Sequence, residues 1–213
     1  MRKWLPGVLI LAGYLFSAAV YSHLPPRVPT HWGLHGPDAW GSRAFGALFT
    51  PTFALALWAL LRWLPTIDPR RASYAKFGST YELFVIATVA MMIVVHVLAL
   101  GAALGWPIRI ESAAPALVGA LFIVIGNALP RARPNWFFGV RTPWTLSSDA
   151  VWERTNRVAG YVMTAIGVAV VVSAFVSTLS MLVVLLGGGA VLVVTALAYS
   201  YVLWRREQRP GRG

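Results

Sequence analysis

Six apolar runs, each about as long as a lipid bilayer is thick, constrain this chain more than any other feature of its sequence. A helix needs about 20 apolar residues to cross the ~30 Å hydrocarbon layer. The runs lie near residues 4–22, 45–64, 80–104, 114–129, 158–177 and 181–204. Only Ser177 to Ser180 separate the last two, which predicts a tight helical hairpin there. All six runs lack the period-two alternation of barrel strands. The sequence therefore predicts an all-α, polytopic integral membrane protein with six transmembrane helices.

The composition is typical of a membrane protein and excludes every kind of site that depends on cysteine. Hydrophobic residues make up 58% of the 213 residues and charged residues 12%, against about 45–50% and about 25% in soluble domains. The chain has no cysteine. Thiol nucleophiles, disulfides and cysteine-ligated metal sites are therefore excluded.

The basic residues predict how the helices are oriented. Fifteen of the 18 Lys and Arg residues fall in segments on one side of the membrane, and only Arg27, Arg43 and Arg109 fall on the other. Because cytoplasmic loops are enriched in Lys and Arg, we expect an N-in, C-in protein of the bacterial plasma membrane. The net charge of +11 is accounted for in this way, and no direct nucleic-acid binding is predicted.

The first apolar run could also be interpreted as a signal peptide, because basic residues precede it and small residues lie near its end. The run from Trp4 to Tyr21 is longer than the ~7–15 apolar residues of a signal peptide. A transmembrane helix is the favoured interpretation.

A polar outer loop follows the first run and holds a candidate metal site. His31, His35 and Asp38 are spaced as i, i+4 and i+7, which on a helix would align two imidazoles and a carboxylate. Gly33, Gly36 and Pro37 oppose a continuous helix there. The favoured prediction is an ordered turn in which Asp38 accepts backbone hydrogen bonds, with no metal or other cofactor.

A longer inner loop, residues 127–157, combines aromatic and basic side chains. Ser148 and Asp149 resemble the start of a helix that leads into the fifth span. The amides of Asn127 and Asn135 would destabilise the protein near hydrocarbon unless they were hydrogen-bonded. We expect a folded, self-bonded loop whose aromatic and arginine side chains contact membrane lipid.

Within the spans, His96 and Glu82 are the ionisable residues of note. His96 is either a functional group or a neutral packed histidine, and Glu82 is expected to pair with Lys76 or a loop arginine. Small residues predict close contacts between helices. They are Gly101, Gly105, Ala159, Gly160, Gly167 and Gly187 to Gly189.

The two loops resemble the SdpI family of bacterial membrane proteins, which join an N-terminal domain of unknown function 1648 to a C-terminal SdpI-type domain. The outer string carries Pro29, His31, Gly36, Asp38 and Trp40. The inner string carries Asn127, Pro130, Pro134, Asn135, Gly139, Arg141, Thr142, Pro143, Trp144, Thr145, Val151 and Trp152. A weaker block spans residues 68–77. Asn156 departs from the family, whose members often have histidine there.

The resemblance implies the same division of the chain. Residues 1–64 form the region similar to the domain of unknown function, and residues 65–112 hold the third span. Residues 113–204 form the SdpI-like region, and residues 205–213 form a basic tail.

The resemblance also implies a function: immunity to a secreted peptide toxin, with signalling by a transcriptional repressor held at the membrane. Toxin binding would fall on His31, Gly36, Asp38 and Trp40. Repressor capture would fall on the inner loop, with Arg141, Trp144 and Trp152 as the candidates. The residues given to partner binding or to a structural motif are Asn127, Pro130, Asn135, Gly139, Arg141, Thr142, Pro143, Trp144 and Trp152. The alternatives are a small transporter or flippase for an amphipathic peptide or lipid, and a metal-dependent membrane hydrolase using His31, His35 and Asp38. The spans hold few polar groups for ion coupling and no catalytic triad is present, so we do not predict an enzyme.

Overall fold

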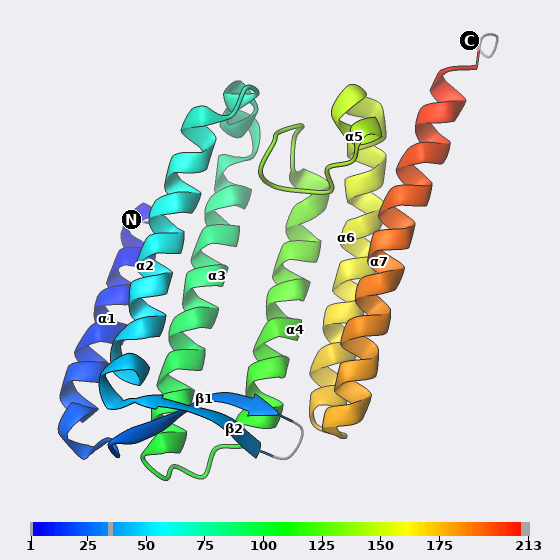
Figure 1. Ribbon diagram of the computed structural model, residues 1–213. Coiled ribbons are helices and arrows are strands. Elements are labelled where there is room, and N and C mark those ends of the chain that lie inside the picture. Colours follow the sequence, from blue (N-terminus) through cyan, green and yellow to red (C-terminus); the bar gives the residue numbers. More distant parts are fainter. Residues whose placement is uncertain (1, 34–35, 210–213) are drawn as a thin grey trace.

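A computed structural model describes residues 2–33 and 36–209 of the chain. Its bundle contains six helices that are long and apolar enough to cross a membrane (Figure 1). The prediction of an all-α, six-helix membrane protein is thereby confirmed. The helices are α1 (Leu5–Val20), α2 (Arg43–Ile67), α3 (Tyr74–Ala103), α4 (Ile110–Ala128), α6 (Asp149–Ala174) and α7 (Thr178–Glu207).

The bundle has two different ends. The first, called the loop end here, holds the start of α1, the end of α7 and the segment between α4 and α6 (Figure 1). Its short helices are η1 (Arg2–Trp4), η3 (Arg71–Ser73), η4 (Leu129–Arg131) and α5 (Pro143–Ser147). The other, the hairpin end, holds η2 (Tyr21–His23), β1 (Arg27–Gly33) and β2 (Gly36–Ser42).

The β-hairpin is an addition to the all-α prediction, which placed only an ordered turn there. The strands pair antiparallel from Arg27 opposite Ser42 to Gly33 opposite Gly36, with irregularities between Pro29 and Trp32. The hairpin lies across the end of the bundle (Figure 1). Val28 is buried in a cluster with Leu24, Ala47 and Leu100. This apolar contact attaches β1 to α2 and α3.

Ser148 and Ser177 mark where the last two spanning helices begin. The Ser148 hydroxyl accepts a hydrogen bond from the N–H of Val151, 3.2 Å away, as an N-cap does. The helix from Asp149 continues without a break into the span, as the sequence predicts. Ser177 caps α7 in the same way, and the predicted tight turn between these two spans is confirmed.

Glycines bring α4 and α6 into close contact, as predicted for Gly160 and Gly167. A Cβ on Gly167 would lie 2.6 Å from the carbonyl oxygen of Gly119, and one on Gly160 would lie 2.5 Å from that of Gly126. No larger residue fits there without separating the helices.

The other predicted glycine contacts between helices are mostly wrong. Gly101 packs against the side chain of Trp106 in the following turn, and Gly105 adopts a φ of +84° just after α3 ends. Gly187 and Gly189 face open space, whereas Gly188 does contact Ile166. Glycines beside a turn or on a lipid-facing surface give the same sequence pattern as glycines at a helix contact.

Two prolines inside α2 explain two contacts between helices. Pro51 and Pro65 have no N–H, so the carbonyls four residues earlier lose their helical partners. The hydroxyl of Ser17 on α1 donates to the Ala47 carbonyl at 2.7 Å, and the hydroxyl of Tyr81 on α3 donates to that of Leu61 at 2.7 Å. Neighbouring helices thus satisfy both carbonyls, as a membrane interior requires.

Candidate functional site

Asn135 organises the segment at the loop end. Its side chain is fully buried. Its Nδ2 donates to the carbonyls of Arg133 and Phe138, both at 2.8 Å, and its Oδ1 accepts from the N–H groups of Phe137 and Phe138. One amide therefore fixes a tight turn from the inside. The predicted self-bonded loop is present in this part of the chain.

Asp68 ties this turn to the connection between α2 and α3. Its carboxylate is 2% exposed. Oδ2 accepts from the N–H of Trp136 at 2.9 Å and from the hydroxyl of Tyr74 at 3.0 Å, and Oδ1 accepts from the N–H of Arg70 at 2.7 Å. Hydrogen bonds from three neutral donors thus stabilise the buried carboxylate of Asp68. The sequence string at residues 68–77 has this structural role.

Gly139 allows the loop to pack against α6. Its φ is +117°, and a Cβ there would lie 2.7 Å from Oδ1 of Asn156 and 3.0 Å from the ring of Trp152. Oδ1 of Asn156 accepts from the N–H of Val140 at 2.8 Å, and Nε1 of Trp152 donates to the carbonyl of Ala132 at 3.0 Å. Only glycine meets both the backbone and the space requirement.

Thr142 joins the loop to α7 through a short helix. Thr142 and Thr145 form a capping box at the start of α5, where Pro143 occupies the first turn. The Thr142 hydroxyl also donates to the hydroxyl of Ser200 on α7 at 3.0 Å. A reciprocal cap of this kind fixes a helix that is too short to be stable alone.

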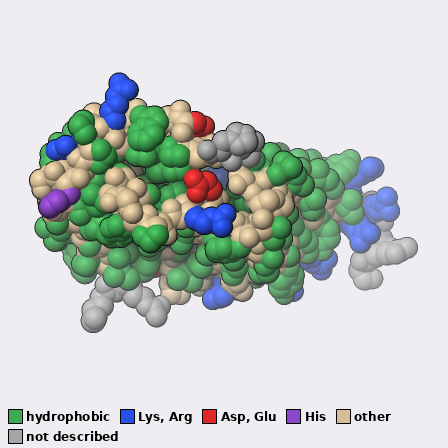
Figure 2. Space-filling model, turned by 90° about the horizontal axis from the view of Figure 1, so that it is seen from below, with side chains coloured by type: hydrophobic (Ala, Val, Ile, Leu, Met, Phe, Trp, Pro, Cys, Tyr) green, Lys and Arg blue, Asp and Glu red, His purple; other side chains and the backbone are tan. Residues whose placement is uncertain are grey.

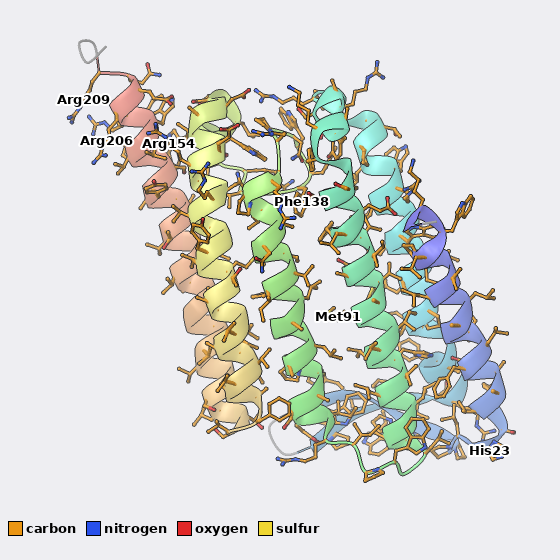
Figure 3. All side chains as sticks on the ribbon, turned by 180° about the vertical axis from the view of Figure 1, so that it is seen from behind. His23, Met91, Phe138, Arg154, Arg206 and Arg209 are labelled. Atoms are coloured by element: carbon orange, nitrogen blue, oxygen red, sulfur yellow. The ribbon has the colours of Figure 1, made fainter. Side chains whose placement is uncertain are left out.

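Aromatic side chains fill the space between α3 and the loop. Phe138 is buried and its ring lies 5.0 Å from that of Phe84, 6.1 Å from that of Tyr81 and 6.3 Å from that of Phe77. Figure 3 shows Phe138 beside the loop-end turns of α4. Edge and stacked contacts of this type add to the apolar burial of the rings.

The three residues predicted to capture a repressor, Arg141, Trp144 and Trp152, differ in exposure, and Trp136 is an accessible side chain that was not predicted. Trp136 is 49% exposed and Arg141 is exposed, with a guanidinium hydrogen bond of 2.6 Å to the carbonyl of Trp136. Trp144 is half-buried against Tyr201. Trp136, Arg141 and Trp144 are thus accessible, whereas Trp152 is fully buried with Asn135 and Thr142 in the interior of the loop, and the prediction that Trp152 contacts a repressor is wrong.

Asn127 and Pro130 lie at the edge of this arrangement. The exposed amide of Asn127 donates to the carbonyl of Ile123 on its own helix at 2.9 Å, so it is not part of the loop network that we expected it to join. Pro130 lies near Gly160, on which a Cβ would be 2.9 Å from the proline ring. Asn127 thus behaves as an ordinary residue at a helix end.

At the hairpin end, His31 and Asp38 form a pair between the two strands. Nδ1 of His31 and Oδ1 of Asp38 are 2.5 Å apart, and the side chains are 69% and 54% exposed. Among the described residues the hydrogen-bond partner of Asp38 is this imidazole, and no described backbone N–H donates to its carboxylate, contrary to our prediction. Exposed pairs of this kind contribute about 0–1 kcal/mol to stability, so this one is available for contact with another molecule.

The helical metal site does not form, because these residues lie on strands. His35 lies outside the described residues. Among the residues that the structure describes, no group of three or more His, Asp or Glu side chains is placed to hold a metal ion. Gly36 has a φ of +106°, as the turn between the strands requires, and Trp40 is 55% exposed. Figure 2 shows this end as a mixed surface with few charges.

His96 on α3 joins that helix to α1 and, through a serine, to α2. Its Nε2 lies 2.7 Å from the hydroxyl of Ser17, which itself donates to the carbonyl of Ala47. Because the serine proton is already donated, His96 must donate from Nε2. The histidine is 1% exposed and fills a structural position in this network. Glu82 pairs with Arg62 of α2 at 3.1 Å, and the predicted pairing with Lys76 or a loop arginine is wrong.

Comparisons with known proteins find matches in both halves of the sequence. The profile of the SdpI/YfhL protein family matches residues 131–200, and a domain of unknown function, DUF1648, matches residues 8–55. The Immunity protein SdpI of Bacillus subtilis (strain 168) is 28% identical over 204 residues, which cover 94% of this chain and 93% of that protein.

The chain is similar to the SdpI family in both of its polar regions and, through the Bacillus protein, along most of its length. The first match contains the loop, α5 and Ser200, and the second contains the hairpin, so the family sequences coincide with the two polar regions of the fold. With this similarity and six spanning helices, it is a multi-pass protein of the bacterial plasma membrane. No solved structure matches the chain.

Sequence reasoning missed several residues that hold the site together. Asp68 and Tyr74 stood in a recognised string without a role, and Ser17, Ser200 and Arg62 stood in none. For Ser17 the sequence did hold a signal, because a proline in a membrane helix, here Pro51, leaves a carbonyl that requires a hydrogen-bond donor from another helix.

Proposed function

We propose that this protein is a membrane immunity protein that gives resistance to a secreted peptide toxin, which it contacts at the hairpin end. The observation that carries the proposal is the similarity to Immunity protein SdpI over 94% of the chain. The exposed His31, Asp38 and Trp40 supply a charged pair and an aromatic side chain for peptide contact. Aromatic residues are frequent anchors in binding surfaces.

The proposed orientation puts the hairpin outside the cell and the loop in the cytoplasm. Arg27, Arg43 and Arg109 belong to the hairpin end, whereas Arg154, Arg206 and Arg209 lie at the loop end, opposite His23 (Figure 3). The positive-inside bias supports this orientation. Because the chain has no cysteine, single Ala39→Cys and Ser147→Cys variants can be labelled on whole cells with an impermeant maleimide. Labelling of Ala39→Cys alone supports the orientation, and labelling of Ser147→Cys alone overturns it.

The loop end is proposed to hold a cytoplasmic partner, a transcriptional repressor, through Trp136, Arg141 and Trp144. These residues are accessible, and the buried network behind them fixes their positions. Signalling requires that toxin binding favour one of two arrangements of the helices. The hairpin contacts α3 near Leu100, and the loop contacts the same helix near Phe77. α3 therefore offers a direct connection between the two ends.

A protection assay tests the proposal. A sensitive bacterium that lacks its own immunity protein expresses wild type, Asp38→Ala or Arg141→Ala at equal membrane levels and is challenged with the peptide toxin. We expect Asp38→Ala to lose protection and Arg141→Ala to keep protection but release the repressor from the membrane fraction.

Asp149→Ala is the matched control for the assay, because Asp149 is also an exposed carboxylate in an ion pair, here with Arg70 at 2.7 Å. It should protect like wild type. Absence of protection by well-expressed wild type contradicts the immunity function, and equal protection by Asp38→Ala contradicts toxin contact at the hairpin.

A further inference from the structure

A cavity of about 460 Å³ opens at the loop end, where α1 begins beside the last turns of α2 and the first turns of α3. Lys3, Arg62, Gly78, Ser79 and Glu82 contribute to its lining. A second cavity of about 360 Å³ shares Lys3 and Arg62 and is lined by apolar and aromatic side chains of α2. The two spaces therefore meet at the same two cations.

The charges of the first cavity favour an anion. Arg62 pairs with Oε2 of Glu82 and remains 42% exposed on its side chain. Lys3 is exposed and has no carboxylate partner among the described residues. A third cavity brings Arg131 next to Ser79. Two cations, one of them paired with Glu82, thus line the first cavity with a serine hydroxyl as an additional donor, and Arg131 lines the third cavity, which that serine also borders.

The second cavity favours an apolar chain. Leu55, Trp58 and Ala59 line it, and Trp4 stands at its edge with 73% exposure. The indole Nε1 of Trp58 is buried and has no hydrogen-bond partner among the described residues. Trp58 therefore contributes the surface of its ring, and not its N–H group, to the lining.

We propose that the paired cavities bind one anionic phospholipid. Its phosphodiester lies by Lys3 and Arg62, and an acyl chain follows Leu55 and Trp58 along α2. Cations at the end of a span, next to an aromatic residue, lie at the depth of the lipid headgroups. This property is separate from immunity: it concerns the helices around α1, whereas the toxin contact concerns the hairpin.

Two pairs of variants test the lipid site. A Cβ on Gly78 meets no atom within 4 Å, so Gly78→Leu adds a side chain to the cavity without displacing protein atoms. Gly189→Leu is its control, because Gly189 also has nothing within 4 Å but lies on α7. Lys3→Gln removes a cation from the cavity, and Lys76→Gln removes the only other lysine of the chain from the same end.

The measurement is native mass spectrometry of the purified full chain, titrated with phosphatidylglycerol or phosphatidylcholine. We expect wild type to retain one phosphatidylglycerol in preference to phosphatidylcholine. Lys3→Gln should weaken retention by about fivefold, as expected for one basic residue at a lipid surface. Gly78→Leu should abolish retention, and both controls should bind as wild type does. Melting temperatures of each variant separate lost binding from lost folding.

Three results overturn the proposal: retention by Gly78→Leu equal to wild type, equal retention of the two lipids by wild type, or equal loss in Lys3→Gln and Lys76→Gln. If Gly78→Leu does not fold, the comparison of the two lysine variants decides the question alone.

Discussion

At the loop end the polar side chains face inward, whereas at the hairpin end they face outward. Asn135, Asp68 and Asn156 are each at most 2% exposed, but the side chains of His31 and Asp38 are more than half exposed. Buried polar groups must be fully hydrogen-bonded and so fix a single structure. Exposed ones contribute little to stability and are free to contact a partner. The loop end thus has a rigid, hydrogen-bonded interior behind its accessible side chains, whereas the polar pair of the hairpin end is itself exposed.

Replacement of Asn135 gives the largest expected loss and tests the rigidity of the loop end. Asn135→Ala leaves two N–H groups and two carbonyls of the turn without their partners. We expect a loss of about 3 kcal/mol or more in unfolding free energy. Thermal unfolding in detergent measures it. Asn127→Ala is the control, since this exposed amide bonds only to its own helix, and a loss as large as that of Asn135→Ala would contradict our description of the network.

The two turn glycines compare the ends directly. Gly139→Ala combines a φ of +117° with contacts to Asn156 and Trp152, whereas Gly36→Ala has a φ of +106° and open space around its Cβ. We expect about 2–3 kcal/mol of destabilisation for Gly139→Ala and about 1 kcal/mol for Gly36→Ala, because only the first adds overpacking to backbone strain. Equal losses in melting temperature would contradict a difference in packing between the ends.

Replacement of one carboxylate at each end compares the buried network of the loop end with the exposed pair of the hairpin end. Asp68→Asn replaces an acceptor by an amide whose NH₂ faces N–H or O–H donors, and we expect a loss of about 2 kcal/mol. Asp38→Asn affects only an exposed pair, so a loss below about 1 kcal/mol is expected. Melting curves of both variants give the ranking. A more destabilised Asp38→Asn would reverse the assignment of rigid and accessible ends.

Removal of the hydrogen bonds to the carbonyls that the prolines of α2 leave free should cause a small loss of stability. Tyr81→Phe and Ser17→Ala each remove the donor to a carbonyl freed by a proline, at about 1 kcal/mol each. In a Pro65→Ala background the helix supplies its own N–H to Leu61, so Tyr81→Phe should lose less there than in wild type. The same holds for Ser17→Ala with Pro51→Ala. Double-mutant cycles measure both couplings, and additive losses would contradict this explanation of the prolines.

A structural feature was predictable from the sequence when it depends on residues that lie close together in the chain. The six spans, the cap at Ser148 and the tight turn at Ser177 are local patterns, and all were predicted. The hairpin was missed because Pro29, Gly33, Gly36 and Pro37 are typical of turns, and the strands depend on the burial of Val28 against α2 and α3. At the site, Asn135 and Gly139 were recognised, but their partners were not.

By itself the sequence determined which segments are apolar enough to cross a bilayer, where the basic residues gather and which strings mark the family. These properties depend on residues close together in the chain and on their transfer from water to lipid. Only the tertiary structure decided that Asp68 would hold Trp136, that Ser17 would satisfy the carbonyl freed by Pro51, and that Asn127 would stay outside the network. Such contacts join residues far apart in the chain, and they form because buried polar groups find partners only where the packed helices bring donors and acceptors together.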